Sequence, residues 1–138
     1  MADALHWKCA KAPSLADLEA LAAAAWQRLP GHFRAVCSDL VIRVEDFAAD
    51  EVLDELGIDS PFDLMGLYQG VSLDKKSVHD LPREPDMVFL YRRALLDYWA
   101  DAEETLGELI THVLVHEIGH HFGFSDADME DIEAQTTA

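Results

Sequence analysis

Residues 116–126 read HEIGHHFGFSD, a stretch that combines a metal-ligand spacing with a signal for the end of a helix. On an α-helix, residues four apart lie on one face, about 6 Å apart along the axis. The imidazoles of His116 and His120 can therefore converge on one zinc ion, at the ~2.0–2.1 Å typical of zinc–nitrogen bonds. Glu117 lies about 100° further round the helix than His116, beside the ion, where a general base for an attacking water is needed.

Asp126 is a candidate third ligand, ten residues after His116. In a continuous helix it would lie about 15 Å beyond His116 along the axis, out of reach of the same ion. Gly123 can adopt the left-handed conformation that ends a helix and turns the chain back. Two neutral imidazoles, one carboxylate and a water form the arrangement with an open position that is typical of catalytic zinc. The pattern therefore predicts one zinc ion held by His116, His120 and Asp126.

The same stretch resembles the signature of the small bacterial zincin-like metallopeptidases, sometimes called minimal zincins. The motif covers residues 116–126, and the preceding helix and a strand near residues 87–92 fit the same layout. Residues 1–86 are compatible with it but contain no diagnostic feature. The resemblance implies a zincin-like fold, the same three zinc ligands and Glu117 as the catalytic acid and base.

Length and composition predict a single domain over residues 1–138, because 50% of the residues are hydrophobic and such a chain can bury a core. The first ten residues, MADALHWKCA, contain no apolar run that resembles a secretory signal. No segment approaches the ~18 apolar residues of a membrane span. We therefore expect a soluble cytoplasmic protein without a membrane partner, in which Cys9 and Cys37 remain thiols.

The chain carries 27 acidic and 10 basic residues, a formal net charge of −17. A field of this sign repels phosphate backbones, so we expect no nucleic-acid partner. It attracts cations, among them Zn²⁺, although we interpret most of the charge as a solvated surface.

Apolar periodicity and turn residues predict the order of the elements. The predicted strands are at 40–44, 64–69 and 87–91. The predicted helices run from Ser14 to the Pro30-Gly31 turn, over 50–56 with an end at Gly57, from Asp101 through the HExxH motif, and over 126–134. Glu104 completes a capping box at the start of the long helix. This order predicts an α+β domain, with a small twisted, mixed sheet of three to four strands packed on the N-terminal helix and the HExxH helix. In larger zincins an edge strand pairs with the extended substrate backbone, and the resemblance gives this role to residues 64–69 or 87–91.

Other residues near the motif allow two interpretations each. His112 lies four residues before His116 and shares its face, either as a further ligand or, as we favour, as a supporting residue of the helix. His79, in a polar loop at 74–86, is either a solvated side chain or a donor to a transition-state oxyanion. Gly119 indicates close helix packing or close approach of a substrate, and Met129 is expected in the core.

The hypothesis that accounts for most of these features is a zinc-dependent metallopeptidase that acts on a peptide or protein substrate. Glu117 would take a proton from the water that attacks the peptide carbonyl and pass it to the leaving amine. One alternative is a metal-binding or interaction module without turnover. The other is a small metal-dependent ribonuclease with a three-histidine motif, against which Asp126, Glu117 and the negative charge argue.

Overall fold

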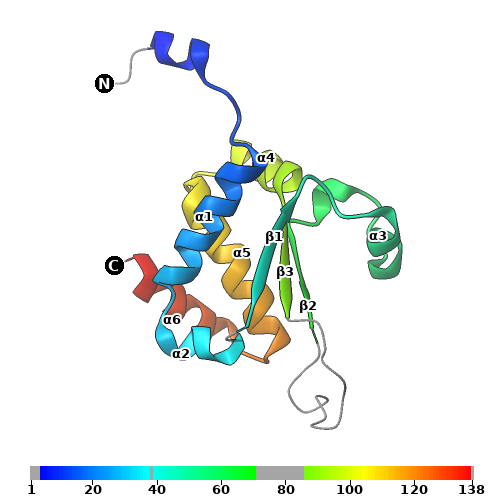
Figure 1. Ribbon diagram of the computed structural model, residues 1–138, viewed down its shortest axis with the longest axis vertical. Helices are drawn as coiled ribbons and strands as arrows, with labels where there is room; N and C mark the ends of the chain where they lie inside the picture. Colours follow the sequence, from blue (N-terminus) through cyan, green and yellow to red (C-terminus); the bar gives the residue numbers. More distant parts are fainter. Residues whose placement is uncertain (1–3, 38, 71–85, 138) are drawn as a thin grey trace.

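The computed structural model describes residues 4–37, 39–70 and 86–137. Most of the predicted polar loop at 74–86, including His79, lies outside these ranges. In the described part of the chain, a small sheet has helices on both of its faces (Figure 1). The fold is α+β, as predicted.

The sheet is mixed and contains three strands within the described residues. β1 (Val41–Glu45) pairs in parallel with β3 (Met87–Tyr91), and β2 (Gly66–Gln69) pairs antiparallel with the other side of β3. Gly66 lies opposite Leu90 in this register. The strand order β1-β3-β2 therefore places β3 in the middle and β2 at an edge of the described sheet.

Within the described residues, the four predicted helices follow the predicted order, together with two α-helices and three 3₁₀-helices that were not predicted. They are η1 (Ala4–Cys9), α1 (Leu15–Arg28), α2 (Gly31–Arg34), η2 (Ala35–Cys37), α3 (Asp50–Leu56), η3 (Pro61–Asp63), α4 (Arg92–Asp101), α5 (Leu106–His121) and α6 (Asp126–Thr137). α1 and α5 lie side by side on one side of the sheet, and α3 lies on the other (Figure 1). The predictions for α1, α3 and α6 are confirmed to within a few residues, and Gly57 ends α3 with a φ of 69°.

Alternate residues of β3 supply the two layers of the core. Val88 and Leu90 are fully buried in the main cluster, which joins them to apolar side chains of α1 and α5. Tyr91 belongs to a smaller cluster with Leu53 of α3. Burial of a side chain the size of leucine contributes about 1.5–3 kcal/mol, so the main cluster stabilises the packing of α5 against the sheet.

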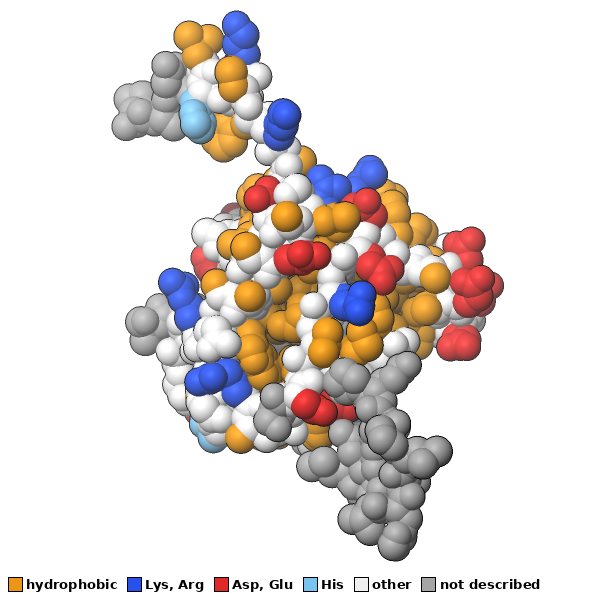
Figure 2. Space-filling model, in the orientation of Figure 1, with side chains coloured by type: hydrophobic (Ala, Val, Ile, Leu, Met, Phe, Trp, Pro, Cys, Tyr) orange, Lys and Arg blue, Asp and Glu red, His pale blue; other side chains and the backbone are white. Residues whose placement is uncertain are grey.

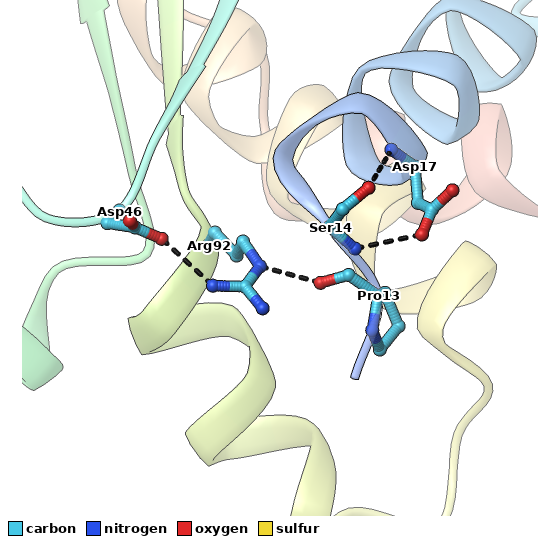
Figure 3. Close-up of polar contacts among 5 residues, drawn as sticks. All are labelled: Pro13, Ser14, Asp17, Asp46 and Arg92. Atoms are coloured by element: carbon cyan, nitrogen blue, oxygen red, sulfur yellow. Dashed lines mark hydrogen bonds and ion pairs between the residues drawn. The ribbon is translucent and has the colours of Figure 1, made fainter. Parts of the chain in front are cut away.

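Arg92 joins three segments at the end of the sheet where α1 and α4 begin (Figure 3). Its Nε donates to the carbonyl of Pro13 at 2.6 Å, and its Nη1 forms an ion pair with Asp46 at 3.0 Å. Next to this contact, the Ser14 hydroxyl accepts from the backbone N–H of Asp17, whose carboxylate accepts from the N–H of Ser14. This capping box confirms that α1 begins after Ser14.

The long helix begins later than predicted. Asp101 is the last residue of α4, and Thr105 caps α5, with its hydroxyl accepting from the backbone N–H of Glu108 at 3.1 Å. We predicted a start at Asp101 because Asp101 and Glu104 have the three-residue spacing of a capping box. Thr105 and Glu108 have the same spacing, so spacing alone does not distinguish the two pairs. α4 itself was missed because its cap, Tyr91, makes no side-chain hydrogen bond to the helix, so no capping signal marks its start.

Acidic side chains gather on α3, at the right of the face in Figure 2. The exposed acids of this helix are Asp50, Glu51, Asp54 and Glu55. Part of the large negative charge is therefore a solvated surface, as we interpreted it. None of the described helices has the length and apolar character needed to span a bilayer.

Candidate metal centre

Three histidines form a row along α5, each four residues from the next. The ring centroids of His112 and His116 are 4.0 Å apart, and those of His116 and His120 are 5.5 Å apart with perpendicular planes. His112 and His120 are exposed, and His116 is half-buried. The helical spacing thus places His116 and His120 side by side, as the sequence indicates, and adds His112 to the same row.

A chain reversal brings α6 back along this row. Gly123 has a φ of 77°, and its N–H donates to the carbonyl of His120, while the N–H of Phe124 donates to the carbonyl of Gly119 at 2.8 Å. These two hydrogen bonds form the Schellman motif that ends a helix with glycine in the left-handed region. Ser125 then caps α6 by accepting from the N–H of Asp128 at 3.1 Å, so one helix ends and the next begins within a short turn.

Glu133, two turns into α6, contacts the first two histidines of the row. Its Oε1 lies 2.8 Å from Nδ1 of His112, and its Oε2 lies 3.5 Å from Nε2 of His116. One donor atom from each of these three residues lies within 4.8 Å of the other two, a spacing that a metal ion can bridge. We did not identify Glu133 from the sequence, although it lies seven residues after Asp126 and therefore on the same face of a continued helix.

The environment of His116 favours the neutral imidazole that binds metals. Burial lowers its pKa, as do the neighbouring rings of His112 and His120, while Glu133 acts in the opposite direction. A neutral ring keeps one nitrogen lone pair available for an ion.

Asp126 is exposed at the first position of α6, and the group around Glu133 does not include it or His120. The structure therefore brings His116 and His120 together on α5 without gathering Asp126 with them. The role of Asp126 as third ligand stays a prediction.

Glu117 lies against the edge strand β2. A Cβ atom built on Gly66 would be 3.5 Å from Cγ of Glu117 and 2.7 Å from Cγ1 of Val113, so this glycine allows α5 to approach the strand. On the same side of α5, His121 stacks on Tyr68 of β2 with ring centroids 3.9 Å apart.

Burial raises the pKa of Glu117, and the charge of His120 partly opposes this increase. A carboxylate with a raised pKa accepts and returns protons more readily near neutral pH.

Gly119 is explained by helix packing. A Cβ atom at this position would be 2.5 Å from Sδ of Met129 and 2.9 Å from its Cγ. Met129 is fully buried, as predicted, between α5 and α6. Of the two interpretations of Gly119, the structure therefore supports close packing of the two helices.

The donors present fit a zinc ion. Imidazole nitrogens and carboxylate oxygens are its usual ligands in proteins, and here they face one another across two adjacent helices. The structure is thus an α+β fold in which two adjacent helices carry donors that could hold a metal ion, next to a half-buried glutamate and the edge of a small mixed sheet. The chain belongs to the zincin-like metallopeptidase family, whose model matches residues 37–136 and so includes all three strands, α5 and most of α6. A search of curated proteins gives no match to the sequence.

Proposed function

We propose that the protein is a zinc-dependent metallopeptidase that hydrolyses peptide bonds. In this proposal His116, His120 and Asp126 hold one zinc ion, and Glu117 is the catalytic acid and base. The observation that carries it is the position of Glu117, which is half-buried between the row of histidines and the edge strand β2. A carboxylate that only supported a structural ion would not need to lie at the edge of a sheet.

When bound, zinc supplies a Lewis acid that acidifies water and polarises a carbonyl group. Glu117 accepts the proton of the attacking water on its carboxylate and returns it to the leaving amine nitrogen. Burial raises the pKa of Glu117, which moves it toward the near-neutral range in which such proton exchange is most efficient. His120, next to Glu117 on the metal side, favours the charged carboxylate that begins the cycle.

β2 is the strand that fits the substrate. β3 is paired on both sides, which excludes residues 87–91, the second candidate strand from the sequence. β2 has a partner on one side within the described residues and contacts Glu117 through Gly66. An extended peptide that adds to β2 by main-chain hydrogen bonds would therefore pass over Glu117.

The test compares Glu117→Gln with the wild-type protein, both loaded with zinc. A degenerate peptide library read by mass spectrometry should show cleavage by the wild type and none by Glu117→Gln, while the zinc content of the two stays equal. Glu130→Gln, which removes an exposed acid of α6, is the control and should cleave like the wild type. Loss of zinc from Glu117→Gln would contradict its role as the base.

Asp126→Ala should weaken zinc binding, because it removes the proposed third ligand. Equal zinc affinity of Asp126→Ala and the wild type would contradict this assignment. If the wild type holds zinc and cleaves no member of the library, the result favours the metal-binding module without turnover.

A further inference from the structure

The histidines of α5 would belong to two overlapping groups of metal ligands, one found around Glu133 and one proposed with Asp126. α6 runs back along α5, so Asp126 follows the end of α5 and Glu133 lies next to His112 and His116. Asp126 and Glu133 are seven residues apart, about 10.5 Å along one face of α6. His112 and His116 thus have Glu133 on the facing helix, whereas Asp126 is only the proposed partner of His116 and His120, and His116 would belong to both groups.

The group around Glu133 has the dimensions of a metal site. Two ligands at ~2.0–2.1 Å from a tetrahedral ion are about 3.3 Å apart. Oε1 of Glu133 lies 2.8 Å from the His112 nitrogen and its Oε2 lies 3.5 Å from the His116 nitrogen, so the two distances lie on either side of this value and the carboxylate presents one oxygen to each ring. The Glu133 side chain is 22% exposed and that of His116 is 28% exposed, so both are partly shielded yet open to an ion from solvent.

We propose that His112, His116 and Glu133 form a second position for a zinc-type divalent cation, which shares His116 with the position proposed at His116, His120 and Asp126. The two positions exclude each other, because a neutral imidazole has one nitrogen lone pair and His116 can therefore bind one ion at a time. When an ion is bound by Glu133 and His116, the proposed catalytic position lacks His116 as a ligand. An ion at this second position would therefore prevent zinc from occupying the proposed catalytic position. Only this competition for His116 rests on the proposed function; the second position itself does not.

The test measures zinc affinity in a protein from which the other position has been removed. His120→Ala takes away a ligand of the proposed catalytic position and leaves the group around Glu133 intact. Isothermal titration with Zn²⁺ should show one ion bound to His120→Ala. Adding Glu133→Gln should weaken this binding at least about tenfold, the smaller end of the effect seen when groups that only support metal ligands are removed. Adding Glu130→Gln instead, an equal change of charge on the same helix, should alter it less than about twofold.

Equal zinc affinity in the two double variants would overturn the proposal, as would the absence of zinc binding by His120→Ala. Circular dichroism and thermal unfolding of each variant show that the comparison is made on folded protein. None of these measurements uses turnover, so failure of the wild type to cleave peptides would contradict the proposed function without affecting this test. His112→Ala in the His120→Ala background provides an independent second arm and should weaken zinc binding as Glu133→Gln does.

Discussion

Gly66 of β2 and Glu117 of α5 are in direct apposition: a Cβ atom added to Gly66 would be 3.5 Å from Cγ of Glu117. The absence of a side chain at this position sets how closely the helix that carries the histidines approaches the edge strand. The separation between the proposed base and a substrate paired with β2 therefore depends on one glycine.

Gly66→Ala should destabilise the protein by about 1–3 kcal/mol, the usual cost of overpacking, because the added methyl meets Val113 at 2.7 Å. It should also reduce kcat of peptide cleavage, since Glu117 would move relative to β2. Urea unfolding and steady-state kinetics measure the two effects. Gly107→Ala is the control, because a Cβ there meets no atom within 4 Å and alanine favours the helix by up to about 1 kcal/mol. Unchanged stability of Gly66→Ala would show that α5 adjusts freely to β2.

Gly119 and Met129 should be energetically coupled. Gly119→Ala should cost about 1–3 kcal/mol through its clash with the Met129 side chain, and Met129→Ala about 2–5 kcal/mol through the cavity it leaves. The double variant should be destabilised by less than the sum, because the new methyl occupies part of that cavity. Urea unfolding of the four proteins gives the coupling energy. An additive result would mean that the methyl at position 119 does not reach Met129.

Gly123→Ala should lower both stability and zinc affinity. Alanine at a φ of 77° costs on the order of 1–2 kcal/mol, and the reversal that returns α6 to the histidines would be disturbed. Gly57→Ala is the matched control, since Gly57 ends α3 at a φ of 69°, on the opposite side of the sheet from α5. It should show a similar loss of stability with unchanged zinc affinity. Equal loss of zinc in both variants would indicate a general effect of unfolding.

The cap of α1 should make stability depend on acid pH. Hydrogen bonds from the backbone and side chain of Ser14 lower the pKa of Asp17 below its ordinary value of 3.8. Because the folded pKa is the lower one, the contribution of Asp17 is present above pH 3.8 and is lost as the pH falls through the folded pKa. Asp17→Asn should therefore reduce stability at pH 7 and have less effect at pH 3. Urea unfolding at the two pH values tests this, and a reduction of equal size at both would contradict it.

Ser14→Ala removes the other half of the same cap and should cost about 1 kcal/mol, as N-cap serine replacements usually do. This loss should be larger at pH 7 than at pH 3, because the hydroxyl also helps to lower the pKa of Asp17. Unaltered stability would mean that the contact of Arg92 with Pro13 alone fixes the start of α1.

The local signals of the sequence predicted most of the fold. The periodicity of α1, the glycine that ends α3 and the apolar run of β3 each depend on a few neighbouring residues, and each is where we expected it. The start of α4 was missed because Tyr91 gives no capping signal, so the change from strand to helix depends on tertiary packing.

The candidate site was predicted only where it is helical. The spacing of His116 and His120 fixes their common face, and Gly123 marks the reversal. Glu133 lies beyond that reversal, and its contact with His112 depends on how α6 packs against α5. The side-chain volume of Met129 against Gly119 sets this packing, which no residue spacing encodes.

The hairpin of α5 and α6 has a consequence for assembly. All donors of the candidate metal centre lie between positions 112 and 133, on two consecutive helices joined by a short turn. Contacts of such low sequence separation form early, whereas the apposition of Glu117 to Gly66 joins segments about fifty residues apart and forms late. During refolding of the complete chain, the metal-binding donors of α5 and α6 would therefore come together before Glu117 packs against β2, and hydrolytic activity would require the completed sheet.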